Sequence, residues 1–191
     1  MFLFNRKVQI ETERLLLRSP TKRDFHEWAR LRYESRAFLK SWDPTWARDH
    51  LTRQSFARRV AWAEKAMNDD SAYPMFLFRK TDNSLLGAIT LDNVRRGPSQ
   101  VGTIGYWMGY PYIRRGHMAE AVGLVLDYAF NELRLHRVEA ACLVHNDPSS
   151  RLLLKLGFTE EGLARQYLCI DGRWQDHRTF GILRSDRPTR N

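Results

Sequence analysis

The sequence predicts an α/β fold of the α+β kind, with a mixed central sheet of about seven strands and about four helices. Large residues fall at every second position in 101–108, and apolar residues recur at helical spacing in 118–133, so a strand leads directly into a helix. Three strand patterns precede this unit, which favours a mixed sheet over a purely parallel one. Asp171-Gly172 between two further strand patterns is a strong hairpin signal.

The N-terminal part reads as one strand followed by two helices. Residues 13–18 form a short apolar strand. Thr21 suits an N-cap, with Asp24 three residues later, and opens a helix. The buried face of that helix is expected to comprise Phe25, Trp28, Ala29 and Leu31. Residues 52–67 form a second amphipathic helix, whose apolar stripe is Phe56, Val60, Ala63 and Met67.

The middle of the chain continues with strands. Residues 75–79 and 85–91 are joined by a polar hairpin turn at 81–84. After the helix that follows 101–108, apolar residues fall at every second position in 136–144, as in a strand. This strand is the natural parallel partner of 101–108, through a right-handed crossover.

A helix and a hairpin end the fold. Asn146 or Asp147, followed by Pro148, marks the start of the helix, and Gly157 marks its end. The strands 164–170 and 173–183 then form the closing hairpin. We expect one domain over 1–191, with a core of about 10–185 and a polar tail at 186–191.

Composition limits the class of protein. With 43% hydrophobic and 28% charged residues, the chain reads as soluble and globular. No apolar run reaches the roughly 18 residues of a membrane span, and the first residues lack the features of a signal peptide. We therefore expect a cytoplasmic protein without a membrane partner.

Cysteine and histidine usage argues against a metal. Cys142 and Cys169 each lie in an apolar strand-like run, so we expect thiols of the core. The six histidines form no spacing typical of metal ligands, so no metal is expected. The net charge of +9 permits nucleic acid, an acidic partner or a polyanionic cofactor.

Cations gather at the start of the helix that follows 101–108. The N-terminal end of a helix dipole is already positive, so cations there are unfavourable by themselves. The cations here are Arg114, Arg115 and the possible imidazolium of His117. Their placement is favourable if an anion completes the site, because backbone N–H groups, Gly116 and arginines together form a phosphate cradle. We interpret 114–119 as a phosphate-binding turn. The alternative is a plain connecting loop with its arginines in water.

This turn resembles the acetyl-CoA-binding motif of the Gcn5-related N-acetyltransferases (GNAT), (Gln/Arg)-x-x-Gly-x-(Gly/Ala). Gly116 takes the fourth place, whereas Ile113 and Met118 depart from the motif. Residues 146–158 fit the family pattern Asn-x-x-Ser-x-x-Leu-x-x-x-x-Gly-Phe without a gap. The opening Thr-Glu-Arg-Leu-Leu-Leu-Arg at 12–18 is also similar to family members, so the resemblance spans about 10–185.

The resemblance implies the GNAT fold, with the fourth and fifth strands, 101–108 and 136–144, splayed apart after a bulge. It implies direct transfer of acetyl from acetyl-CoA to a primary amine through a tetrahedral intermediate, without a metal. The phosphates would lie on the turn, and strand backbone would bind the pantetheine arm and polarise the thioester. The residues so implied for acetyl-CoA are Trp107, Met108, Gly109, Arg114, Arg115, Gly116, His117, Met118, Ala119, Asn146 and Ser149.

The catalytic groups follow from the same resemblance. Leu153 stands where many relatives have a tyrosine, so Ser149 is implied as the acid for the leaving thiolate, with Asn146 holding the pantetheine arm. The alternative is that both residues only cap the helix. Gly109-Tyr110 stands where relatives often carry an acidic pair, which leaves the general base unidentified. An α-amine has a pKa of about 7.7–8.0 and is partly neutral at cytoplasmic pH, whereas a lysine side chain, with a pKa near 10.4, is almost wholly charged. The lack of an evident base therefore favours an α-amine as the acceptor.

Residues 38–46 resemble, more narrowly, the RimJ/RimL-type ribosomal-protein N-terminal alanine acetyltransferases, through Phe-Leu-x-x-Trp-x-Pro. This implies a protein N-terminus as acceptor, with ribosome contact, in a pocket lined by Trp42, Trp46, Tyr106 and Tyr110. From the residues alone, the two tryptophans equally suit the core. Two other functions stay open: an acetyltransferase for a small amine (a polyamine, an amino acid or an antibiotic), and a non-catalytic RNA- or ribosome-binding protein. A homodimer is also left open.

Overall fold

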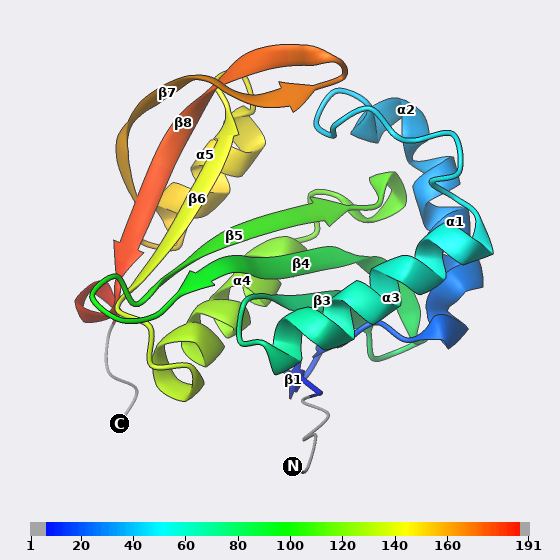
Figure 1. The fold of residues 1–191 in the computed structure, drawn as a ribbon, viewed down its shortest axis with the longest axis horizontal. Coiled ribbons are helices and arrows are strands. Elements are labelled where there is room, and N and C mark those ends of the chain that lie inside the picture. Colours follow the sequence, from blue (N-terminus) through cyan, green and yellow to red (C-terminus); the bar gives the residue numbers. More distant parts are fainter. Residues whose placement is uncertain (1–6, 188–191) are drawn as a thin grey trace.

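The computed structural model describes residues 7–187 and shows one mixed sheet of eight strands in the order β1-β2-β3-β4-β5-β6-β8-β7 (Figure 1). The strands are β1 Gln9–Glu11, β2 Leu15–Arg18, β3 Tyr73–Arg79, β4 Ser84–Arg95, β5 Val101–Met108, β6 Arg137–Leu143, β7 Thr159–Ile170 and β8 Arg173–Leu183. The α-helices of the described chain are α1 Phe25–Glu34, α2 Arg36–Leu39, α3 Arg53–Asn68, α4 His117–Asp127 and α5 Asp147–Lys155.

The predicted mixed sheet is confirmed. The structure has one strand, β1, and one α-helix, α2, more than the sequence predicts. β1 has three residues without an apolar alternation, so no sequence pattern marks it. The short α2 falls in the turn-rich stretch before Trp42. The remaining helices and strands lie close to where the sequence predicts them, although β4 and β7 are longer than expected. Thr21 caps a 3-10 turn, Lys22–Asp24, that leads into α1, and the helix predicted to run to 133 ends as α4 at Asp127, followed by a π-helical turn at Tyr128–Glu132.

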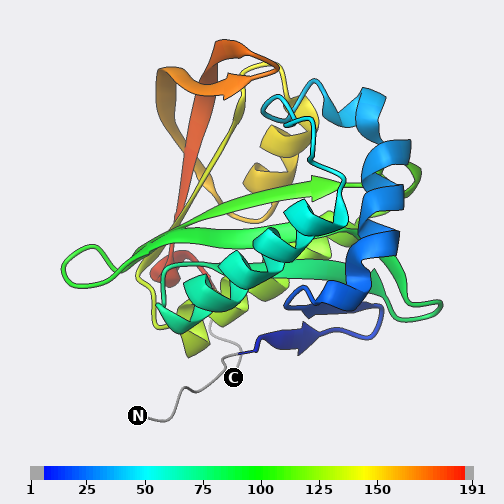
Figure 2. The same cartoon turned by 45° about the vertical axis from the view of Figure 1, so that its right-hand side comes forward.

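β5 and β6 form the parallel pair of the sheet, connected by α4 as predicted. Their ladder joins 101–104 to 137–140 and then stops, although β5 continues to Met108 and β6 to Leu143. Both views show the two strands moving apart from that point (Figures 1 and 2). The predicted splay is therefore present, and among residues 7–187 no strand pairs with the β6-facing edge of β5 after Ile104.

The bulge expected at the splay lies elsewhere. β4 pairs with β5 in unbroken register along 103–108, and the register shift falls between Asp92 and Arg95. Asn93 takes up this irregularity with a φ of 50°, a left-handed conformation that asparagine tolerates better than most residues. β5 therefore separates from β6 although β5 itself contains no bulge.

Apolar cores form on both faces of the sheet. α4 covers one face, where Val122, Val125 and Leu126 are fully buried, and α1 and α3 cover the other (Figure 2). The predicted stripe of α3 is confirmed, since all its members are 1% exposed. On α1, Trp28 and Leu31 are buried as predicted, whereas Phe25 and Ala29 are only half-buried.

The start of α5 follows the predicted capping. The Asn146 side chain accepts a hydrogen bond from the Ser149 N–H at 3.2 Å, and Pro148 occupies the first turn. Gly157 has a φ of 93° and follows the end of the helix, as predicted. Asn146 and Ser149 are thus fixed relative to each other at the helix N-terminus.

Cys142 is buried as predicted, whereas Cys169 is only half-buried. Among residues 7–187, no helix combines the length and apolar character needed to cross a bilayer. The predicted tail is described as far as Arg187, and 188–191 lie outside the described residues.

Candidate active site

The turn at 114–119 starts α4 with an unusual backbone. Gly116, the N-cap, has a φ of 78°, and Arg114 has a φ of 60°. A Cβ on Gly116 would meet no atom within 4 Å, so the positive φ and not crowding favours glycine here. Arg114 and Arg115 are exposed and form no ion pair with any residue in 7–187. The first N–H groups of α4 and two free guanidinium groups therefore share one surface.

His117 does not supply the imidazolium that the sequence left possible. Its side chain is 7% exposed, and its Nδ1 has no hydrogen-bond partner among the described residues. Burial, followed by the charges of Arg14, Arg79 and Arg115, lowers its pKa. The positive charge at this turn therefore comes from the arginines, while His117 packs as a neutral ring.

The unpaired edge of β5 lies beside this turn. The Gly109 N–H donates to the Leu86 carbonyl oxygen at 2.8 Å, on the β4 side. Because backbone groups alternate in direction along a strand, those of Tyr106 and Met108 face the gap towards β6. A Cβ on Gly109 would lie 2.4 Å from Leu31 Cδ1, whereas one on Gly105 would meet no atom within 4 Å. Close packing on α1 thus explains Gly109, and open space lies beside Gly105.

A tyrosine and a serine meet across the gap. The Tyr106 hydroxyl lies 2.8 Å from the Ser149 hydroxyl, and Asn146 caps the same helix turn. Burial raises the pKa of Tyr106 to about 12, so the phenol keeps its proton at neutral pH. Leu153, at the position where many relatives have a tyrosine, is 1% exposed in the core. As predicted, this position offers no phenol that could act as the acid. Sequence reasoning placed Tyr106 in the acceptor pocket and missed its contact with Ser149, because 43 residues separate the two.

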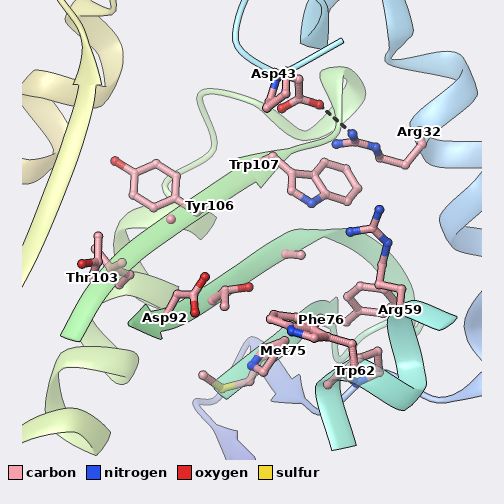
Figure 3. A pocket seen from close by; sticks show the side chains of 18 of the residues that line it. Arg32, Asp43, Arg59, Trp62, Met75, Phe76, Asp92, Thr103, Tyr106 and Trp107 are labelled. Carbon is pink, nitrogen blue, oxygen red and sulfur yellow. Dashed lines mark hydrogen bonds and ion pairs between the residues drawn. The ribbon is translucent and has the colours of Figure 1, made fainter. Parts of the chain in front are cut away.

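A cavity of about 630 Å³ opens on the face covered by α1 and α3 and reaches Tyr106 (Figure 3). Trp46 and Tyr106, two residues predicted for the acceptor pocket, line it. Trp42 and Tyr110 lie outside it. Trp42 packs against Phe38 and His145, with ring centroids 6.4 and 5.7 Å away. Trp42 is half-buried and Tyr110 is 57% exposed, so neither belongs to the buried core, and neither lines this cavity.

The loop that carries Trp46 contacts the tip of the closing hairpin. The Asp171 N–H donates to the Asp43 carbonyl oxygen at 3.1 Å, and Lys40 lies 3.7 Å from the Asp171 carboxylate. Tyr167 and Leu168 of β7 line the cavity from that side. The cavity is therefore walled by segments far apart in the chain.

One end of the cavity holds a buried ion pair. Arg32 is 6% exposed, and its Nη2 lies 2.6 Å from an Asp43 carboxylate oxygen. The guanidinium stacks on Trp46 at 4.3 Å and on Trp107 at 4.6 Å, measured to the ring centroids. The Trp46 indole N–H donates to the same Asp43 oxygen at 3.0 Å. Arg32 is thus held rigidly, with the flat faces of its guanidinium covered by indoles.

Other polar groups in the cavity were missed by sequence reasoning. His50 stacks on Trp46 with ring centroids 4.5 Å apart, and burial, followed by the charges of Arg32 and Arg59, lowers its pKa to about 4. Arg59 of α3 points into the cavity near Trp107, and Asp92 of β4 lies at the opposite end, below Tyr106 (Figure 3). One signal was available, since Arg32 follows Trp28 by four residues on the apolar side of α1.

No group of three or more His, Cys, Asp or Glu side chains within 7–187 is placed to hold a metal ion. A family model described as "Acetyltransferase (GNAT) domain" matches residues 14–159. The chain belongs to the GNAT acetyltransferase family. The resemblance seen in the sequence and the fold it implied are therefore confirmed, and the protein is an acetyl-CoA-dependent N-acetyltransferase.

Relatives of this GNAT enzyme cover nearly its whole length. It is 37% identical over 163 residues to the probable N-acetyltransferase YjcK of Bacillus subtilis (strain 168), covering 85% of this chain and 90% of that protein. It is 33% identical over 171 residues to the ribosomal protein uS5-alanine N-acetyltransferase of Escherichia coli (strain K12), covering 90% and 88%. The structure of Mycobacterium smegmatis RimJ in complex with CoA-disulfide has a TM-score of 0.89 at 27% identity, covering 97% and 91%.

Proposed function

We propose that this GNAT enzyme acetylates the N-terminal α-amine of a ribosomal protein. One observation carries the proposal: Tyr106 lines the large cavity and also hydrogen-bonds to Ser149, so the cavity meets the gap between β5 and β6 at a single side chain. A donor in the gap and an acceptor in the cavity would meet there. The uS5-alanine N-acetyltransferase, 33% identical to this chain, supports the acceptor class.

The donor side is built from backbone and arginines. The N–H groups at the start of α4, with Arg114 and Arg115, suit the phosphates of acetyl-CoA, because a helix N-terminus and guanidinium groups both favour anions. The free edge of β5 at Tyr106 and Met108 offers hydrogen bonds to the amides of the pantetheine arm. Asn146 is the further polar side chain that we assign to this arm.

The reaction needs a proton donor for the leaving group. The amine nitrogen forms a bond to the thioester carbonyl carbon, and the bond from that carbon to sulfur then breaks, with its electron pair going to sulfur. The proton that the nitrogen loses passes to water, and water returns a proton to Ser149 after the thiolate has been protonated. A thiolate with a pKa near 8.5 requires only a modest acid, and we assign this role to the Ser149 hydroxyl. The Tyr106 hydroxyl, protonated at neutral pH, lies 2.8 Å from the Ser149 oxygen, and we assign it the donor role in this contact, which stabilises charge on Ser149.

The acceptor must lose a proton before it attacks. An α-amine with a pKa of about 7.7–8.0 is partly neutral near pH 7.5, and the proton passes to water in the open cavity. Asp92, at the Tyr106 end, attracts the ammonium form into the cavity by its charge. A lysine side chain near pKa 10.4 would remain almost wholly charged.

A small amine is the second candidate acceptor. The volume of about 630 Å³ lies in the range of sites for small molecules, roughly 300–1,000 Å³. Its walls include four tryptophans, which suit an aromatic or cationic ligand as well as a peptide: Trp28, Trp46, Trp62 and Trp107.

A panel of acceptors with labelled acetyl-CoA tests the proposal. It comprises peptides from ribosomal protein N-termini that begin with alanine or serine, peptides with a blocked N-terminus and one lysine, and small amines. We expect the free N-terminal peptides to have the highest kcat/KM. Turnover confined to small amines would support the second candidate, and a lysine peptide preferred over every α-amine would contradict the α-amine assignment.

A further inference from the structure

Two guanidinium groups converge at the end of the cavity opposite Asp92. Arg32 approaches from α1 and Arg59 from α3, and the Trp107 indole lies beside both (Figure 3). The Arg32 position is fixed by Asp43 and by the two stacked indoles. Arg59 is water-accessible inside the cavity and packs over Trp28, 5.5 Å from the ring centroid.

The charges at this end do not cancel. Asp43 neutralises Arg32, whereas Arg59 forms no ion pair with any residue that the structure describes. Asp49, the next carboxylate along the loop, pairs with Arg58 on the outer side of α3. His50 adds no charge at neutral pH, because its pKa is lowered to about 4. This end of the cavity therefore has one surplus positive charge, beside Trp107.

Arg32 also keeps a hydrogen-bond donor without an acceptor. Its side chain is more than nine-tenths buried, and its Nε–H has no partner within 7–187. Asp43 accepts only from the Nη2 end of the guanidinium. This nitrogen is closed off from solvent, so Arg32 acts as a fixed positive wall of the cavity, and Arg59 is the guanidinium that a ligand can reach.

We infer that the acceptor carries a carboxylate, which binds the exposed Arg59 guanidinium at the end of the cavity that Arg32 and Trp107 also line. The inference rests on the proposed function, since it concerns the acceptor of the same site. Guanidinium groups bind carboxylates through paired, charge-assisted hydrogen bonds. The single surplus charge matches one carboxylate, whereas a phosphate group would bring nearly two negative charges.

The cavity is then complementary to an acceptor with opposite charges at its two ends. The amine lies at the Asp92 and Tyr106 end, and the carboxylate lies at the Arg59 end. An acidic side chain close to the N-terminus of a protein supplies such a group, and so does the C-terminal carboxylate of a very short peptide. Both sources present the same chemistry to the arginines.

Three matched peptide types separate these sources. All three begin with alanine. The first has glutamate at one of positions 2–5, and the second has glutamine at the same position; both have an amidated C-terminus. The third is a tripeptide with glutamine and a free C-terminus. Acetylation is measured as kcat/KM, and binding to the CoA-loaded enzyme is measured by calorimetry. Binding thus reports on the charge preference even for a peptide that is not acetylated.

The variants are Arg59→Gln, Arg59→Lys and Arg59→Glu, with Arg58→Gln as the matched control. Arg58 is the preceding residue of α3, lies outside the cavity and pairs with Asp49 at the surface. Circular dichroism and CoA affinity confirm that each variant is folded.

We expect the wild-type enzyme to prefer the glutamate peptide over its glutamine twin by roughly tenfold to a hundredfold at the best position. Arg59→Gln removes this ratio, Arg59→Lys keeps part of it, and Arg59→Glu favours a lysine at the same position. Arg58→Gln keeps the wild-type ratio. A preference confined to the free-acid tripeptide assigns the carboxylate to a C-terminus.

Equal kcat/KM and equal binding for charged and neutral twins would overturn the inference, and so would a preference that survives Arg59→Gln. In the first of these cases the proposed function stands if the peptides are acetylated. Conversely, charge-dependent binding that Arg59→Gln abolishes supports the carboxylate site even if no peptide is acetylated, and that outcome would contradict only the proposed function.

Discussion

The Tyr106 hydroxyl lies 2.8 Å from the Ser149 hydroxyl and joins two walls that the sheet itself leaves apart. Tyr106 belongs to β5 beyond the last rung shared with β6, and Ser149 belongs to the first turn of α5. The Asn146 side chain fixes that turn from the other side. This chain of hydrogen bonds therefore sets the position of the proposed acid.

Replacing either hydroxyl tests this arrangement. We expect Ser149→Ala and Tyr106→Phe each to lower kcat by roughly tenfold to a hundredfold, because each loses a group that stabilises the leaving thiolate. The double variant is expected to lose less than the product of the two effects, because both act through one hydrogen bond. Rapid-mixing kinetics at saturating substrates measure kcat. An unchanged rate for Ser149→Ala would remove serine from the mechanism.

The pH profile of kcat/KM follows from two groups. Activity should rise as the pH passes through about 8, where an α-amine becomes neutral. Because the pKa of Tyr106 is raised to about 12, its proton is retained above pH 10, and no fall in activity is expected up to that pH. A decline with a midpoint below 10 that disappears in Tyr106→Phe would contradict the raised pKa. A rise that continues towards pH 10.4 would indicate a lysine acceptor.

Gly116→Ala tests the phosphate-binding turn. At a φ of 78°, alanine is strained by about 1–2 kcal/mol, although its methyl group has free space. The backbone should relax and weaken CoA binding by about fivefold to thirtyfold, as calorimetry would measure. Gly123→Ala is the control within the same helix; it should leave CoA affinity unchanged and raise stability by about 0.5–1 kcal/mol. Equal CoA affinity for both variants would argue against the turn as the phosphate site.

Local patterns accounted for much of this molecule. The switch from strand to helix spacing after Met108, the cap at Asn146 and the apolar stripe of α3 depend on neighbouring residues and could be read from the sequence. The splay and the acetyltransferase activity came from resemblance to a family. Neither required knowledge of tertiary contacts.

The cavity could not be predicted in the same way. Arg32 and Asp43 read as ordinary charged residues, and only the packing of α1, the loop at 43–46 and β5 buries them together between two indoles. The contact of Tyr106 with Ser149 likewise depends on how far β5 departs from β6. Side-chain contacts between distant segments carry no periodic signal in a single sequence.

Asp43→Asn tests the buried ion pair. The change leaves the Arg32 guanidinium, 6% exposed, without a compensating charge, so we expect the free energy of unfolding to fall by roughly 2–4 kcal/mol. Asp49→Asn is the control, because its partner Arg58 is 57% exposed and such pairs contribute about 0–1 kcal/mol. Urea denaturation of both variants gives the comparison. Equal losses would show that burial adds nothing to the Arg32 pair.

The contact between α1 and the end of β5 is tested by Gly109→Ala. A methyl group there would approach Leu31 Cδ1 to 2.4 Å, so Leu31 or the helix must move, and we expect a loss of about 1–3 kcal/mol in unfolding free energy. Gly105→Ala places the same methyl group four residues earlier in β5, where no atom lies within 4 Å, and should change stability by less than about 0.5 kcal/mol. Because Gly105 lines the cavity, that variant should instead raise the KM of the acceptor. If the two variants were equally stable, close packing on Leu31 would not be the reason for glycine at position 109.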